Sequence, residues 1–281
     1  MTRISRQLYT DHMEALKVEQ AAGLLRNQGK GYEAAIKYAK ARTLYEQAGD
    51  LKNVAGCQHM VGVSYKVEND LKKAIPALEE ALPLYERAGS LTGPGRVWRD
   101  MGIMYAYHGQ YAQAEKLLLQ SQNSLESITS DANPDRDAEL GITIVKIGLL
   151  HLEMKRFPVA EEQMMSGLLL IRKTGQSFYE MTALMHLGSL YFATKHYGRM
   201  LANLQAALGL IYEFDMQHEQ TRRLAEIWGL LAHGYIHHQN HKTATYFAKK
   251  ALAEIKTMNP NAQSPVRKHI QADLLRKQLA L

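Results

Sequence analysis

The most regular feature of the chain is a short apolar motif in which a small residue is followed, three positions later, by an aromatic or similar side chain. Around it, apolar residues recur three and four positions apart, which is the period of a helix packed on one face. Clear copies lie at residues 61–65, 101–105 and 187–191, and weaker copies at 147–151 and 231–235. The pattern predicts a series of similar helices along the chain.

A second motif recurs after short polar breaks. It centres on Ala34, Ala74, Ala114, Ala160, Met200 and Ala244, which are spaced by 40, 40, 46, 40 and 44 residues. An apolar or small residue recurs four and seven positions later, which places all three side chains on one face of a helix. The two motifs predict helix pairs. Because one pair cannot bury its own apolar face, the pairs are expected to stack.

Together the two motifs resemble the tetratricopeptide repeat, which carries W-x2-L-G-x2-Y on its first helix and A-x3-F-x2-A on its second. The third copy is the most complete, with Trp98, Met101, Gly102, Tyr105, Gly109, Tyr111 and Ala114 in place. Six copies lie at about residues 14–50, 53–90, 94–127, 138–175, 178–214 and 221–257. The resemblance implies an all-α fold, a right-handed superhelical solenoid of about six antiparallel helix pairs in residues 1–262.

The repeats depart from the standard form in length, since they run nearer 40 residues than 34 and lack the usual terminal proline. This long form is similar to the repeats of LGN-type spindle-orientation adaptors and of Rap-type bacterial peptide sensors. Pro83 falls late in a second helix and is expected to bend or end it. Five glycines lie just past apolar segments, where left-handed residues end helices: Gly29, Gly49, Gly89, Gly109 and Gly175.

The last segment, residues 263–281, reads as a helix that caps the final repeat. Ser264 is placed to cap its first turn and Pro265 to start it. An apolar stripe follows, formed by Val266, Ile270, Leu274 and Leu281. We expect this stripe to close the last hydrophobic face, as solenoids require. A second copy of the chain docked on the stripe, which would make a homo-oligomer, is the alternative.

Composition places the chain among folded globular proteins, since 46% of its residues are apolar and 22% are charged. Its 281 residues fit one elongated domain or two compact ones. No apolar run is long enough for a membrane span, and the N-terminus does not resemble a signal peptide. A single cysteine, Cys57, fits a reducing compartment, so we expect a cytoplasmic protein.

The net charge of +6 is unevenly distributed. Residues 1–140 carry 17 Lys or Arg and 18 Asp or Glu, whereas residues 141–281 carry 17 and 10. The second half also holds 9 of the 12 histidines. Its basic surface favours an acidic protein partner over nucleic acid, because the regularly recurring polar readers of RNA-binding repeat arrays are missing.

Residues of the first helices that are out of phase with the core motif are expected to line a partner-binding groove. They are Arg26, His59, Met60, Lys66, Arg96, Arg99, Asp100, Tyr107, Lys146, Met185, His186, Phe192, His233 and His237. This mixture of cationic, aromatic and methionine side chains suits an acidic or amphipathic peptide. The alternative is a solvated face with no ligand. The Lys and Asn pair of the carboxylate clamp in chaperone-binding repeats is missing from the matching positions.

Motifs of catalysis and cofactor binding are missing from the sequence. It has no Walker-type phosphate loop, no H-E-x-x-H, no G-x-S-x-G and no cysteine cluster. His233 and His237 lie one turn apart, beside His238 and His241, but no nearby Cys or carboxylate completes a metal site. We therefore expect no enzyme activity, no cofactor and no metal.

These observations predict a non-enzymatic scaffold or adaptor that holds an acidic or amphipathic segment of a partner protein in its concave groove. The alternative is a regulatory sensor, in which a small peptide changes the shape of the superhelix and its affinity for a second partner. The similarity to Rap-type proteins motivates this alternative.

Overall fold

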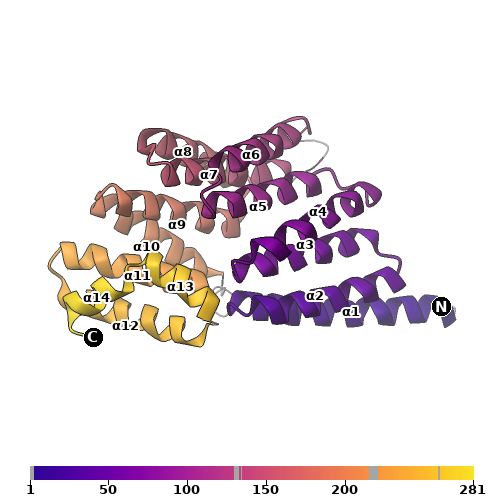
Figure 1. Cartoon of the computed structure of the whole chain (residues 1–281), viewed down its shortest axis with the longest axis horizontal. Coiled ribbons are helices and arrows are strands. Elements are labelled where there is room, and N and C mark those ends of the chain that lie inside the picture. The colour runs from indigo at the N-terminus through magenta and orange to yellow at the C-terminus, as the bar shows by residue number, and fades with distance from the viewer. Residues whose placement is uncertain (1–2, 130–132, 134, 215–220, 259) are drawn as a thin grey trace. The chain divides into compact units, whose positions relative to one another are not determined.

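The computed structural model describes residues 3–129, 133, 135–214, 221–258 and 260–281, and the regular structure within these ranges is helical throughout (Figure 1). The helices are α1 (Arg3–Asn27), α2 (Gly31–Gln47), α3 (Leu51–Val67), α4 (Leu71–Arg87), α5 (Gly93–Tyr107), α6 (Tyr111–Glu126), α7 (Arg136–Glu153), α8 (Phe157–Arg172), α9 (Ser177–Ala193), α10 (Tyr197–Glu213), α11 (Thr221–His237), α12 (His241–Thr257), α13 (Pro260–His269) and α14 (Ala272–Leu279). Consecutive helices up to α12 form six antiparallel pairs. The predicted all-α repeat fold is confirmed.

The chain divides into two compact units, Met1–Glu139 and Leu140–Leu281. The first unit contains α1 to α6 and the first residues of α7. The second contains the rest of α7 and the helices from α8 to α14. None of the described helices is both long and apolar enough to span a membrane.

In the α5–α6 and α7–α8 pairs, a glycine lies where the two helices cross. A Cβ atom added to Gly102 of α5 would lie 2.8 Å from Leu118 Cγ and 3.2 Å from the Ala114 carbonyl oxygen of α6. At Gly148 of α7 the same atom would lie 2.7 Å from Met164 Cγ. These separations are shorter than van der Waals contact, so glycine lets the paired helices approach closely.

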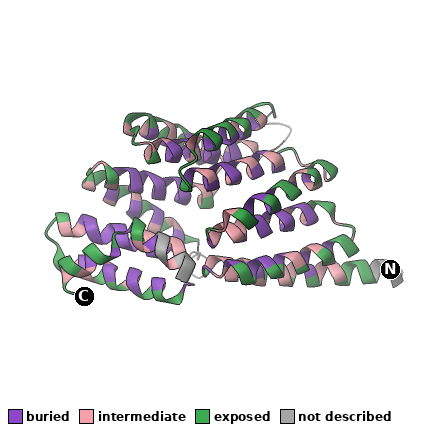
Figure 2. Cartoon of the chain, viewed as in Figure 1, coloured by how far each residue is buried: buried purple, intermediate pink, exposed green. Residues whose placement is uncertain are grey.

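The second helices bury the face that the alanine motif predicted. Side chains at the six central positions are fully buried: Ala34, Ala74, Ala114, Ala160, Met200 and Ala244. Leu78 and Leu118, four positions after their alanines, are fully buried as well. Figure 2 shows this arrangement as buried stripes along the sides of the helices that contact their neighbours. The core of each unit is therefore a continuous layer between stacked pairs.

The turns confirm all five glycine predictions, since Gly29, Gly49, Gly89, Gly109 and Gly175 have positive φ angles. The hairpin turns of the other pairs use residues that carry a Cβ atom. Asn69, Lys155, Lys195 and Gln239 have φ angles between 57° and 61°. Left-handed lysine and glutamine are uncommon, so their turns have no signature in the sequence.

Pro83 does not end α4, so of the two outcomes expected for it, a bend or an end, the end is wrong. The helix contains both Pro76 and Pro83 and continues to Arg87. The two prolines lie seven positions apart and are both exposed. On this solvent-facing side, water can satisfy the carbonyl groups that lose their helical partner, and the packed face of α4 is unaffected.

The C-terminal cap is confirmed, and it consists of two short helices, α13 and α14. Helix α13 begins at Pro260, so Ser264 and Pro265 lie within it rather than at its start; their side chains lie outside the described part of the structure. Gln271, with a φ angle of 49°, separates the helices. This left-handed residue changes the direction of the chain. Val266 and Ile270 stay fully buried, but Leu275 is buried instead of Leu274.

Candidate functional site

The first helices of successive pairs contact one another through the polar residues predicted to line a groove. In the first unit, Arg26 Nη1 lies 2.9 Å from Met60 Sδ, which joins α1 to α3. His59 and Lys66 of α3 both contact the Asp100 carboxylate of α5. These contacts bridge neighbouring pairs, so part of the predicted groove lining holds the repeats together.

His59 is the most buried member of this network, with 1% of its surface exposed. Its Nε2–H donates to Asp100 Oδ2 at 3.0 Å, and its Nδ1 accepts from the Tyr85 hydroxyl at 3.1 Å. Burial lowers the pKa of His59, and the Asp100 carboxylate opposes that shift. The neighbouring Lys66 and His59 hold the pKa of Asp100 well below its usual range against the opposing effect of burial.

Arg96 and Arg99 of α5 both bind Glu139, the last residue of the first unit. Arg99 Nη1 lies 2.5 Å from Glu139 Oε2, and Arg96 Nε lies 3.4 Å from Oε1. Arg99 also donates to the Glu139 carbonyl oxygen at 3.3 Å. Arg99 and Glu139 are buried, so this ion pair has a structural role whether or not a partner binds nearby.

The corresponding residues of the second unit have a different electrostatic environment. Lys146 Nζ of α7 donates to His186 Nε2 of α9 at 2.6 Å. Burial, then Lys146, Arg223 and His269, lower the pKa of His186 well below its usual range. The histidine is therefore neutral and accepts the lysine hydrogen bond. Met185, also predicted for the groove, is buried.

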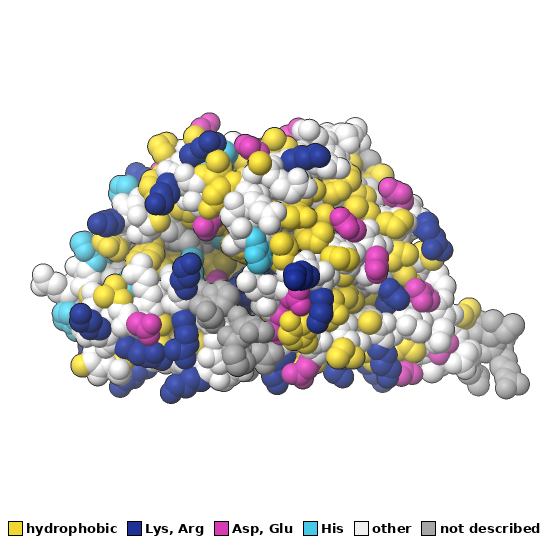
Figure 3. Space-filling model, viewed as in Figure 1, with side chains coloured by type: hydrophobic (Ala, Val, Ile, Leu, Met, Phe, Trp, Pro, Cys, Tyr) yellow, Lys and Arg dark blue, Asp and Glu magenta, His cyan; other side chains and the backbone are white. Residues whose placement is uncertain are grey.

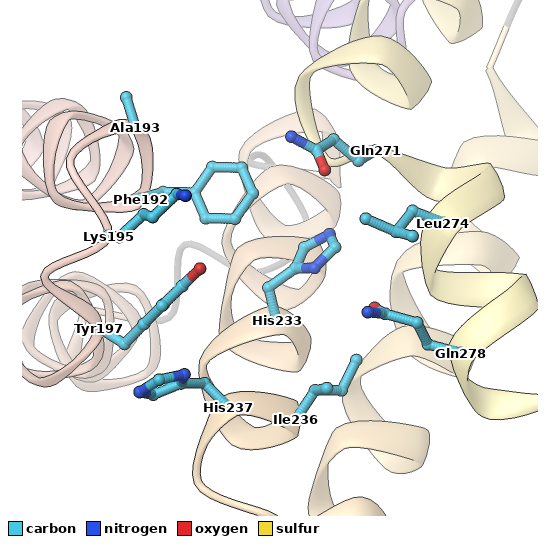
Figure 4. Close-up of a pocket in the computed structure, with 10 residues that line it drawn as sticks. All are labelled: Phe192, Ala193, Lys195, Tyr197, His233, Ile236, His237, Gln271, Leu274 and Gln278. Atoms are coloured by element: carbon cyan, nitrogen blue, oxygen red, sulfur yellow. The ribbon is translucent and has the colours of Figure 1, made fainter.

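A pocket of about 360 Å³ opens in the second unit where α9 and α11 end and α14 passes (Figure 4). Its lining residues are Phe192, Ala193, Lys195, Tyr197, His233, Ile236, His237, Gln271, Leu274 and Gln278. Phe192, His233 and His237 belong to the predicted groove. The other seven were missed, because α14 approaches α11 only in the folded chain and the turn residue Lys195 belongs to neither repeat motif.

Four rings form one side of the pocket. Phe192 and His233 have ring centroids 5.0 Å apart, and Tyr197 stacks on His237 with centroids 4.2 Å apart and an interplanar angle of 28°. Figure 4 shows Gln271, Leu274 and Gln278 on the opposite side, on and just before α14. The pocket is thus a slot between an aromatic wall and a wall of amides and one leucine.

His233 connects the two walls. Its Nε2–H donates to the Ile270 carbonyl oxygen at 2.8 Å, and burial lowers its pKa. The ring is therefore neutral, with Nδ1 as the nitrogen that can accept a hydrogen bond. Lys195 supplies a positive charge to the lining, which contains no Asp or Glu.

Of the remaining predicted residues, Tyr107 is 53% exposed at the end of α5 and Arg26, Met60 and Lys66 are half-buried. Among the described residues, no three His, Cys, Asp or Glu side chains are grouped to hold a metal ion. On the face shown in Figure 3, Lys and Arg side chains gather over the C-terminal helices.

The sequence matches the soluble NSF attachment protein (SNAP) family over residues 2–127, which is less than half of the chain. The match covers most of the first unit and none of the pocket. No curated protein sequence matches the chain at a significant level.

Solved tetratricopeptide-repeat proteins have a similar fold. A signal transduction ATPase with numerous domains and a tetratricopeptide repeat sensor, from Pyrococcus horikoshii, is 17% identical with a TM-score of 0.59, over 92% of this chain and 37% of that chain. A chain of the APC/C hetero-tetramer Cut9-Hcn1 is 17% identical with a TM-score of 0.57, over 95% and 46%. The apo form of RapI is 13% identical with a TM-score of 0.53, over 99% and 84%. At these identities the likeness establishes the tetratricopeptide-type fold alone.

Proposed function

We propose that the chain is a non-enzymatic scaffold that binds a protein or peptide partner and holds an acidic or amphipathic segment of it. The observation that carries this proposal is the open pocket of the second unit, which combines aromatic rings, amides and a lysine at the ends of two first helices. Helical repeat proteins bind extended or helical peptides on surfaces lined by successive repeats.

Charge supports an acidic partner. Residues 141–281 carry 17 Lys or Arg against 10 Asp or Glu, and the pocket lies within them. A basic surface raises the rate at which an acidic segment is captured, and the effect weakens as salt screens it. In the first unit, by contrast, the predicted cationic residues Lys66, Arg96 and Arg99 contact Asp100 or Glu139.

We also propose a cytoplasmic location. The single cysteine, Cys57, is buried, and burial raises the pKa of its thiol to about 12. A buried, protonated thiol packs as a small apolar group. This use of cysteine requires no oxidising compartment.

Selection from a random peptide display library on the immobilised full chain tests the binding proposal. We expect enrichment of peptides rich in acidic and aromatic residues, and loss of most captured peptides in high salt. Cross-linking and mass spectrometry should place them on the second unit. Failure to enrich any peptide over the bare support would overturn the proposed function.

A further inference from the structure

We infer that the pocket receives one aromatic side chain of the bound segment and that Lys195 pairs with the carboxylate of an adjacent acidic residue. This inference rests on the proposed function and assigns a chemistry to the site. It concerns the slot lined by Phe192, Tyr197, His233 and His237 on one side and by α14 on the other.

The size of the slot suits a short part of a bound segment. A volume of about 360 Å³ lies at the low end of the range for small-molecule pockets. A cavity of about 150 Å³ is enough to hold benzene, so the slot has room for one large ring and for part of the residue next to it. The rest of a bound segment must therefore run across the protein surface, outside the open side of the pocket.

The wall chemistry selects a ring. Tyr197 and His237 stack on each other, so their planes are already fixed before a ligand arrives. Phe192 packs against His233 with the two rings tilted by 36°, and His233 is itself hydrogen-bonded to Ile270. Preformed ring surfaces favour the edge-to-face or offset contacts of another aromatic group. Ile236 and Leu274 supply the aliphatic contacts around it.

Two amides on the opposite wall suit a peptide backbone. Gln271 and Gln278 lie on either side of Leu274, and both are exposed. Each side chain offers a donor and an acceptor, which matches the N–H and C=O groups next to a bound aromatic residue. Leu274, which is 41% exposed, is then covered by the ligand rather than by its own fold.

The charge of the lining selects an acidic neighbour. Lys195 is an exposed lysine in the turn between α9 and α10, and no acidic side chain lines the slot to oppose a carboxylate. A lysine ammonium and a carboxylate form a charge-assisted hydrogen bond, which is stronger than one between neutral groups. A nucleotide would also combine a ring with negative charge, so adenosine monophosphate serves as a competing probe in the test.

Ligand-observed NMR titration of the full chain at low salt tests the inference with capped dipeptides. The probes are acetyl-Phe-Asp-amide and acetyl-Asp-Phe-amide, with Asn-for-Asp and Ala-for-Phe counterparts. We expect at least one Phe and Asp probe to bind about tenfold more tightly than its Ala-for-Phe counterpart and about threefold more tightly than its Asn-for-Asp counterpart. Equal binding by all probes, no binding by any, or tighter binding of adenosine monophosphate would overturn the inference.

Substitutions locate the binding. Lys195→Gln should reduce the affinity of the Phe and Asp probe to that of its Asn counterpart, and Lys195→Glu should reverse the preference toward acetyl-Phe-Lys-amide. Tyr197→Ala should weaken every Phe-containing probe. Matched controls on the same unit are Lys173→Gln and Tyr212→Ala, whose exposed side chains lie outside the pocket lining.

The two proposals fail separately. If library peptides bind the chain but Lys195→Gln and Lys195→Glu leave their affinities unchanged, the pocket assignment is wrong and the scaffold proposal stands. If no library peptide binds, both are wrong. Lys195 is exposed, so these variants test the assignment even if Tyr197→Ala lowers the stability of the fold.

Discussion

Both units consist of similar helix hairpins. They differ in the residues that form the hairpin turns and in the charged groups that surround their buried histidines. Gly102 in the first unit and Gly148 in the second occupy equivalent crossings. The hairpin turns of the first unit use Gly29, Asn69 and Gly109, whereas those of the second use Lys155, Lys195 and Gln239.

Their buried histidines differ as well. His59 of the first unit donates to the Asp100 carboxylate, whereas His186 of the second accepts from Lys146 and has Arg223 and His269 nearby. At Gly102 and Gly148 an added Cβ atom would meet atoms of the partner helix. The residues of the turns and of the contacts between first helices differ more between the units. In the second unit, the turn residue Lys195 lines the pocket.

The largest expected effect concerns the buried ion pair of the first unit. Glu139→Gln leaves Arg99 buried without its carboxylate, so we expect a loss of about 3 kcal/mol in the free energy of unfolding. The matched change in the second unit is Glu180→Gln, whose partner Arg172 is 52% exposed. That change should cost less than about 1 kcal/mol. Chemical denaturation measures both, and similar losses would contradict the distinction.

The shared crossing predicts similar losses in both units. Gly102→Ala and Gly148→Ala place a Cβ atom within 3.2 Å of the carbonyl oxygens of Ala114 and Ala160. Each should lower the free energy of unfolding by about 2 kcal/mol, the usual cost of an overpacked core. Gly198→Ala is the control, because nothing lies within 4 Å of its added Cβ. A neutral result at either crossing would show that the helices can separate there.

The buried histidines should make stability depend on pH. Because the folded pKa of His186 lies well below 6.5, the unfolded chain binds its proton first as pH falls. The stabilisation is present above pH 6.5 and is lost below it, by about 1 kcal/mol per pH unit. His186→Gln should therefore reduce the difference in stability between about pH 7.5 and 5.5.

The same change at the other buried histidine sharpens the comparison. Burial lowers the pKa of His59, but the Asp100 carboxylate opposes the shift, so His59→Gln should reduce the pH dependence less than His186→Gln does. Asp100 adds no pH dependence between about pH 5.5 and 7.5. The stabilisation that it provides is lost only as pH falls below 3.8 toward its lowered pKa. Equal reductions by the two variants would contradict the role of the neighbouring charges.

The smallest expected effect lies in the hairpin turns. Lys155 has a φ angle of 58°, so Lys155→Gly should relieve strain and raise the free energy of unfolding by roughly 0.5–1 kcal/mol. Gly109→Ala introduces the same strain into the first unit, where φ is 72°, and should lower it by about 1 kcal/mol. Shifts in the denaturation midpoint of opposite sign are expected from the two variants.

The sequence by itself determined the helix pairs, their central alanines and their glycine turns. These features depend on contacts within one helix pair, such as that between Gly102 and Ala114. Such contacts join residues that are a fixed number of positions apart, so they appear as a repeating sequence pattern. It also indicated Phe192, His233 and His237 as candidate binding residues from their phase on the first helices.

Only the tertiary structure decided how those residues are used. Nothing in the pattern distinguishes Arg99, which is buried against Glu139, from Tyr107, which is exposed on the same helix. Nor does it place Gln271 and Gln278 in one pocket with Lys195, because that arrangement depends on the left-handed break after α13. Helical periodicity reports which face of one helix is apolar, whereas the pocket depends on where segments distant in the sequence come to lie.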